Sequence, residues 1–294
     1  MSGGQRLLCY ESKAPLLRLL NLESLEIEEL ATPWDRGFAI DTAWHRDTYI
    51  ALHQTDRGII RFERSLSGSG RLLGPSYYSP FPAAARDHVW LCDPQGRRHD
   101  KPHVAGEIDG EGKVMRELHL PGGVFLRGEL GQRFVVQMGS ELYLWPGRGP
   151  VGRHPVANGW FVGVFSDTLI WVEVDTRATL RWAGAFDGAI TPTGVGFWTY
   201  VHPSPAPTGS TIAIPFDSTV KGRGGLAIVD LVNGTSVVAE GDFKYSSYRP
   251  VWSRDGDAIF LGLPFERRIA RVDTKSLAME RLAIKRAPMP ILAV

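Results

Sequence analysis

Three residues of the chain, His202, Arg249 and Asp41, carry side chains that could together perform acid–base chemistry on a small molecule. An imidazole exchanges protons near neutral pH, a carboxylate can accept a proton, and a guanidinium binds an anionic group through paired hydrogen bonds. The three residues lie far apart in the sequence, and a hydrogen-bonded structural histidine is the commoner outcome for a residue such as His202. They are the catalytic candidates if the protein is a hydrolase or lyase, an alternative that the sequence does not favour.

A second set of residues combines aromatic rings with cationic groups. Tryptophan, tyrosine and arginine supply most of the energetic anchors of protein interfaces. The candidate binding residues are Trp44, Arg46, Arg127, Trp198, Tyr200, Tyr248 and Arg249. The chain has nine tryptophans in all, and for most of them packing in the core is the competing interpretation.

Other acidic residues and histidines give weaker indications of a site. Glycoside chemistry needs two carboxyl groups about 5–10 Å apart, and five carboxylates could meet its requirement: Asp41, Asp47, Glu129, Asp167 and Asp187. His99 and His103 are four residues apart, but Pro102 between them argues against the helix that would place both on one face. We expect the two histidines to lie in a surface loop, and we expect no metal site.

Composition excludes several classes of function. The net charge is +1 with acidic and basic residues interleaved, which is unlike the clustered Lys and Arg of a nucleic-acid-binding surface. We find no glycine-rich nucleotide-binding loop, and we expect no cofactor. The sequence also has no Gly-x-Ser-x-Gly motif of the kind that carries the nucleophile of a serine hydrolase. Two cysteines, Cys9 and Cys92, and the lack of an apolar leader or spanning segment predict a cytoplasmic protein that is not bound to a membrane.

A repeated segment indicates which elements would position these residues. The segments 19–30 and 271–282 align without gaps, share Ser-Leu, a later Glu and a final Leu, and start 252 residues apart. That offset is six periods of about 42 residues, within the range of a four-stranded propeller blade. A third copy, 226–238, lies about one period before the last, and each copy is typical of a strand, a polar turn and a second strand.

A second motif precedes the last repeat. The segment 249–260 contains Pro250, Val251, Trp252 and Ser253, followed by an Asp-Gly turn and an apolar strand, and 202–214 has the same form without the tryptophan. Both segments resemble the repeat of TolB-like and other WD40-like β-propellers. The resemblance covers about two blades and implies a fold without implying a function.

The turn spacing then divides the chain as one domain, residues 1–294, into a seven-bladed all-β propeller. Six blades are the alternative, if the short fifth blade is not a full unit. The predicted blades are 37–75, 76–121, 122–157, 158–189, 190–242, 243–287, and a blade made of 5–33 with 289–294. Strands from both ends of the chain would thus share a blade, which removes the free edges of the ring.

Three functional hypotheses follow. The favoured one is a non-catalytic propeller that binds a protein partner as a scaffold or subunit of a cytoplasmic complex, with the aromatic and basic set at one mouth of the central channel. The second is the hydrolase or lyase described above, which would bind its small-molecule ligand at the same mouth. The third is a carbohydrate-binding propeller that uses exposed tryptophans.

Overall fold

Short apolar stretches bounded by Gly, Pro, Asn and Asp form strands throughout the computed structural model of the chain. The structure describes residues 5–10, 17–30, 39–45, 48–53, 59–63, 71–74, 78–82, 88–92, 101–109, 113–165, 167–173, 179–185, 187–190, 203–207, 210–217, 224–241, 249–263, 266–284 and 288–293. These residues contain 28 strands and no helix. The strands form seven antiparallel sheets of four strands each within the described ranges.

Backbone contacts divide the chain into two compact units. One comprises Met1–Glu11, Leu17–Leu30 and Val162–Val294, and the other Ser12–Leu16 and Ala31–Phe161. The second unit holds three sheets. Their strands are β4 (Ala39–His45), β5 (Thr48–His53), β6 (Ile59–Glu63) and β7 (Arg71–Gly74); β8 (Tyr78–Pro82), β9 (Val89–Cys92), β10 (His103–Ile108) and β11 (Val114–Leu120); and β12 (Phe125–Leu130), β13 (Arg133–Met138), β14 (Glu141–Trp145) and β15 (Ala157–Asn158).

The first unit holds the other four sheets. Three of them follow chain order: β16 (Trp160–Phe165), β17 (Thr168–Glu173), β18 (Thr179–Gly184) and β19 (Gly188–Ile190); β20 (Ser204–Pro205), β21 (Thr211–Asp217), β22 (Gly224–Asp230) and β23 (Thr235–Gly241); and β24 (Val251–Trp252), β25 (Ala258–Leu263), β26 (Arg268–Asp273) and β27 (Met279–Arg281). The fourth joins β28 (Met289–Ala293) to β1 (Arg6–Tyr10), β2 (Leu17–Asn21) and β3 (Ile27–Leu30).

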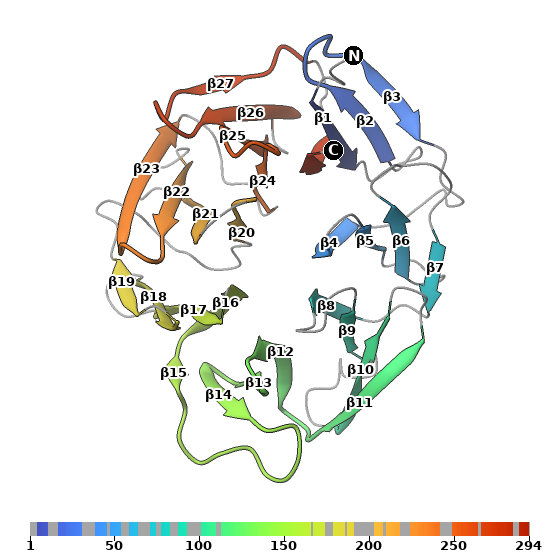
Figure 1. Cartoon of the computed structure of the whole chain (residues 1–294), viewed down its shortest axis with the longest axis vertical. Coiled ribbons are helices and arrows are strands. Elements are labelled where there is room, and N and C mark those ends of the chain that lie inside the picture. The colour runs from blue at the N-terminus through green and yellow to red at the C-terminus, as the bar shows by residue number, and fades with distance from the viewer. Residues whose placement is uncertain are drawn as a thin grey trace. The chain divides into compact units, whose positions relative to one another are not determined.

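Strands from both ends of the chain meet in that fourth sheet. β28 pairs antiparallel with β1, with Leu8 opposite Leu292 and Tyr10 opposite Met289, and Figure 1 shows the red C-terminal strand beside the dark blue β1. Leu7, Leu8 and Cys9 are fully buried in this sheet. The predicted sharing of one sheet by the two termini is confirmed.

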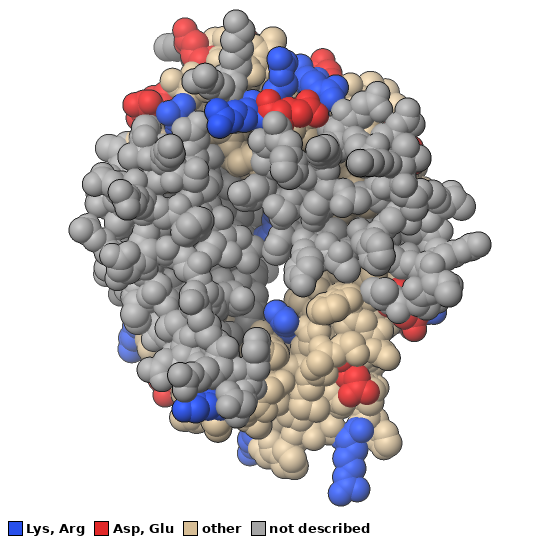
Figure 2. All heavy atoms as spheres, turned by 180° about the vertical axis from the view of Figure 1, so that it is seen from behind, with Lys and Arg blue, Asp and Glu red and all other residues tan. Residues whose placement is uncertain are grey.

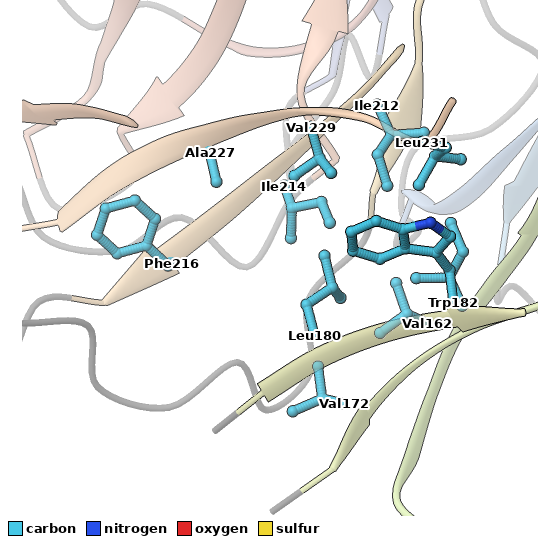
Figure 3. Close-up of a cluster of buried hydrophobic side chains, with 11 residues drawn as sticks. Val162, Val172, Leu180, Trp182, Ile212, Ile214, Phe216, Ala227, Val229 and Leu231 are labelled. Carbon is cyan, nitrogen blue, oxygen red and sulfur yellow. The ribbon is translucent and has the colours of Figure 1, made fainter. Parts of the chain in front are cut away.

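Apolar side chains between successive sheets form the core. Figure 3 shows one such cluster, in which Trp182 and Val162 of the sheet β16–β19 face Ile212 and Val229 of the sheet β20–β23. Of the six tryptophans whose side chains are described, five are buried: Trp90, Trp145, Trp171, Trp182 and Trp252. Packing in the core therefore accounts for most of the described tryptophans, and Trp160 is the exposed one among them.

The aligned repeat corresponds to one recurring turn between the third and fourth strands of a sheet. In each copy a side-chain oxygen accepts hydrogen bonds from the backbone N–H groups two and three residues later, which holds the turn closed. The distances are 2.8 and 3.1 Å at Asn21, 2.9 and 3.2 Å at Asp230, and 3.1 and 2.7 Å at Asp273. The fourth residue after each of these, Leu25, Gly234 and Leu277, has a φ of 59°, 63° and 60°. The repeat is therefore local turn chemistry.

The second sequence motif is also explained by its contacts. The indole N–H of Trp252 donates to the carbonyl of Ser204 in the preceding sheet over 2.9 Å. Ser253 Oγ donates to Asp255 over 2.6 Å and accepts from the N–H of Ala258 over 2.9 Å, so the tight turn is closed by side chains. The Gln5 side-chain amide donates to Asp255 over 2.7 Å, which ties this turn to the strand β1 region.

We expect the recurring turn to make stability depend on pH. Hydrogen bonds from the backbone N–H and hydroxyl of Ser276 hold the pKa of Asp273 below its ordinary value. A lowered folded-state pKa adds stability that is complete above the unfolded-state pKa, about 3.9, and is lost as the pH falls through the folded-state pKa. Asp273→Asn keeps the accepting oxygen, as Asn21 does at the matching position, and removes the titration.

Urea unfolding at several pH values between 6 and 3 tests this expectation. The variant should lose less free energy of unfolding than the wild type as the pH falls. Glu240→Gln, which removes an exposed carboxylate on β23, is the control and should follow the wild-type profile. Parallel profiles for Asp273→Asn and the wild type would contradict the assigned role of the turn.

Candidate functional site

The structure describes four of the predicted site residues. It describes the backbone of Asp41 and Trp44, and both the backbone and the side chain of Arg127 and Arg249. Asp41 and Trp44 lie in β4, Arg127 lies in β12, and Arg249 precedes β24 and is half-buried. The remaining candidates lie outside the described residues: Arg46, Trp198, Tyr200, His202 and Tyr248. The predicted catalytic combination of His202, Arg249 and Asp41 therefore stays a prediction.

The first strands of three neighbouring sheets share one irregularity. In β12, Phe125 and Gly128 pair with Gln137 and Val135, so three steps along β12 match two steps along β13. β4 and β8 have the same mismatch after their first residue. A bulge of this kind bends a strand and redirects the residue that it carries.

The third residue of each strand lies within this mismatch, between the pairs that flank it. These third residues are Asp41 in β4, Pro80 in β8 and Arg127 in β12. β4 packs beside β8, and β8 contacts β12. Two of the sequence-predicted site residues, Asp41 and Arg127, thus lie within the bulged part of their strands in the same unit.

Arg127 is held in place by a buried glutamine. Its Nε–H donates to Oε1 of Gln137 over 2.8 Å, and Gln137 Nε2 donates in turn to the carbonyl of Gly139 over 2.9 Å. Gln137 is only 2% exposed. Since both ends of its amide are bonded, the glutamine fixes the plane of the guanidinium, which also lies over the ring of Phe125 at 5.5 Å.

His103 lies near the same aromatic ring. Its imidazole centroid is 6.3 Å from that of Phe125. The sequence predicted a surface loop at His103, and the structure corrects that prediction: His103 is the first residue of β10, pairs with Leu120, and is half-buried. The strand begins directly after Pro102, because a proline is tolerated just outside a strand.

A row of polar and charged side chains, which sequence reasoning missed, ties the sheet β8–β11 to the sheet β12–β15. His88 Nδ1 lies 2.8 Å from Glu107 Oε1, Arg116 Nε donates to Glu107 Oε2 over 2.8 Å, and Arg116 Nη2 donates to Glu129 over 2.6 Å. The Glu107 and Glu129 side chains are 6% and 7% exposed. A carboxylate removed from water in this way needs the arginine as its partner.

Aromatic rings complete the setting of Arg116. Its guanidinium carbon lies 4.8 Å from the centroid of Trp90 and 5.0 Å from that of Phe134. The two rings meet edge to face with their centroids 5.3 Å apart. We define His88, Glu107, Arg116 and Glu129 as the inter-sheet network and regard it as structural, because its arginine is occupied by two carboxylates and two rings.

Two of the other predicted carboxylates, those of Asp187 and Glu129, have structural contacts, and Asp47 lies outside the described residues. Asp187 accepts a hydrogen bond from the N–H of Gly184 over 3.0 Å, and the Asp167 carbonyl accepts one from Ala185 over 3.1 Å. Glu129 belongs to the inter-sheet network. Within the described residues, no three His, Cys, Asp or Glu side chains are grouped closely enough to hold a metal ion.

Opposite charges lie beside one another on the described surface. Figure 2 shows basic and acidic side chains intermixed at its upper edge. In the sheet β24–β27, Arg271 pairs with Glu280 over 3.0 Å and Lys275 with Asp257 over 2.9 Å. No helix among the described residues has the length and apolar character needed to cross a membrane.

Comparisons with known proteins identify the architecture. A protein of unknown function from Desulfotomaculum acetoxidans is 9% identical, covers 98% of each chain and gives a TM-score of 0.63. A "putative 6-phosphogluconolactonase" from Bacteroides fragilis is 11% identical, with 99% and 96% of the two chains covered and a TM-score of 0.59. Apo AztD from Citrobacter koseri is 12% identical, with 99% and 98% covered and a TM-score of 0.54.

The chain has a β-propeller fold. No protein-family model matches the sequence, and no curated protein matches it. Identities this low establish the fold alone. β4, β8 and β12 each lie at one end of their sheet and are the first strand of that sheet in chain order.

The inter-sheet network should contribute more to stability than an exposed ion pair. Arg116→Met leaves the buried Glu107 and Glu129 without their shared cation, and we expect it to lower the free energy of unfolding by about 2–3 kcal/mol, below the ~3–5 of a fully buried pair because the arginine is half-exposed. Arg271→Met, the control, breaks the exposed pair with Glu280 and should cost less than about 1 kcal/mol. Urea unfolding of both variants measures the difference, and equal losses would disprove the role given to Arg116.

Proposed function

We propose that the protein is a non-catalytic binding propeller that acts as a scaffold or subunit of a cytoplasmic complex and recognises a protein partner. The seven described sheets support seven blades in place of the alternative six. The Trp252 and Ser253 contacts support the TolB-like and WD40-like resemblance of the last blade. The buried free thiol of Cys9 fits a reducing compartment.

One observation carries the proposal of a protein partner. β11 is the outermost strand of its sheet and is seven residues long, and its first four residues are exposed. Val114 and Met115 are each 48% exposed, and Met115 is the extra residue of a bulge in β11 opposite Glu107 and Ile108. An outer strand with an apolar start offers backbone groups to an added strand and apolar contacts to its side chains. We therefore place the partner, as an extended segment, along β11.

An enzyme acting on a small molecule is the second candidate. It is supported by Asp41 and Arg127, which both lie within the bulged part of the first strand of their sheets, β4 and β12. Asp41 is a potential base, and Arg127 is a potential ligand of an anionic group. The two candidates differ in where the ligand binds, on β11 or at β4 and β12, and in whether the ligand is released chemically changed. The carbohydrate-binding alternative has little support, since five of the six described tryptophans are buried and Trp160 alone among them is exposed.

Affinity purification from the native host followed by mass spectrometry tests the proposed binding surface. The wild-type chain should recover a stoichiometric partner, and the double variant Val114→Lys with Met115→Lys should recover less than about a tenth as much, because charge on an edge strand blocks strand addition. Val237→Lys, which changes a 46% exposed valine on the outermost strand β23, is the matched control.

Two outcomes would overturn this proposal. Recovery of no stoichiometric partner by the wild-type chain would remove the scaffold function itself. Equal recovery by the wild type and by the folded double variant would show that β11 is not the binding surface.

A further inference from the structure

The connection between β14 and β15 differs from the matching connection in other sheets. In three sheets the third and fourth strands are joined by the recurring turn in which a side-chain oxygen accepts two backbone hydrogen bonds. In the sheet β12–β15 they are joined by the longer loop 146–156 (Figure 1). After Pro146, this loop consists of two tandem copies of Gly-Arg-x-Pro-Val, 147–151 and 152–156. The loop thus takes the place of the turn and carries one arginine in each copy.

The loop is basic and lies in a part of the chain that has no acidic residue. No aspartate or glutamate occurs between Glu141 and Asp167, although the whole chain has a net charge of only +1. Arg148 and Arg153, one from each copy, are both exposed. Neither side chain has an ion pair or a hydrogen bond among the residues that the structure describes. Both guanidinium groups are therefore open to a carboxylate supplied from outside the chain.

The loop is fixed to the rest of its unit at three points. The indole N–H of Trp145 donates to the carbonyl of Gly149 over 3.0 Å, and the N–H of Val156 donates to the carbonyl of Leu142 over 2.8 Å. Val151, which lies between the two arginines in the sequence, packs against the buried apolar cluster shared by the sheets β8–β11 and β12–β15. A loop that is ordered before binding loses little conformational entropy when a partner arrives.

The loop also lies beside β11, the strand on which the proposed partner is placed. Gly147 has a φ of 84°, and a Cβ atom added to it would come within 2.8 Å of the Phe134 ring and 3.3 Å of the Leu118 side chain in β11. The glycine therefore allows the backbone of the loop to approach this strand closely. A protein segment bound along β11 would have the basic loop next to it.

We propose that the loop 146–156 docks an acidic segment of the partner protein, whose carboxylates pair with Arg148 and Arg153. The inference rests on the proposed function and names the chemistry of its partner. A guanidinium binds a carboxylate through two parallel hydrogen bonds. A nucleic acid fits less well, because it needs clustered basic residues over a wide surface, and opposite charges are intermixed on the described surface outside the loop.

Fluorescence anisotropy of a fluorescein-labelled peptide of eight glutamates, titrated with the full chain at low ionic strength, tests the loop. The wild type should bind the peptide saturably, and its affinity should fall as salt is added, because exposed charges are screened. Arg148→Ala and Arg153→Ala should each weaken binding about two- to fivefold, and together about tenfold, since each removes an exposed ion pair.

The matched control is the double variant Arg133→Ala with Arg254→Ala. It removes two exposed arginines and the same net charge, but both arginines lie outside the loop. Its affinity for the peptide should equal that of the wild type. The proposal is overturned if the wild type does not bind the peptide, or if this control weakens binding as much as the loop double variant. Tighter binding of a labelled strand of eight deoxythymidines would also overturn it, because the loop would then recognise nucleic acid.

The experiment separates this inference from the proposed function. Equal peptide binding by the wild type and by the loop double variant would remove the acidic docking site and leave partner binding at β11 in place. Peptide binding that only the loop double variant loses, together with recovery of no partner from the native host, would remove the scaffold function and still support the loop as a site for acidic segments.

Discussion

The pairing of β28 with β1 is the interaction on which the remaining structure depends. A row of sheets that pack face against face has an apolar face and a set of unpaired strand edges at each end, and both are costly in water. Pairing β28 with β1 satisfies the backbone groups along that edge of β1 within one sheet. The full burial of Leu7 and Leu8 beside a strand more than 280 residues later shows how much apolar area this sheet encloses.

A turn and a β-bulge recur along the chain. The turn depends on nearby residues only, and the bulge depends on pairing with another strand. The turn built on Asn21, Asp230 and Asp273 is local, since each side chain bonds only to the next few residues. The bulge at the third residue of β4, β8 and β12 depends on pairing with another strand. The same bulge occurs in β28, where three steps from Met289 to Leu292 match two steps from Tyr10 to Leu8. The turn determines where a hairpin closes, and the bulge determines the local bend of β4, β8, β12 and β28.

This difference explains what the sequence could predict. The repeat at 19–30 and 271–282 was visible because an Asx-type turn requires particular residue types at fixed spacing. The bulge at Arg127 was not visible, because strand register depends on partners that sequence spacing does not reveal. Arg127 was found through its residue type, whereas Gln137 and Phe125, which contact it, were missed.

The inter-sheet network was missed for a related reason. In β10, Ala105 and Glu107 lie on the same face of the strand, and both are buried. An acidic residue that shares the face of a buried alanine was the available signal, but the pattern alone also fits a solvated strand. Only the placement of Arg116 and His88 beside Glu107 shows that its charge is compensated inside the protein.

Amide hydrogen exchange, followed by mass spectrometry, tests the terminal pairing most directly. Peptides covering β28 should exchange slowly, as those of β1 do, because pairing with β1 protects the backbone N–H groups of β28 that face it. β2, which pairs with the other edge of β1, gives the reference level of protection. Fast exchange of 289–293 alongside slow exchange of 17–21 would show that the C-terminal strand is not part of the sheet, and would contradict this account of the fold.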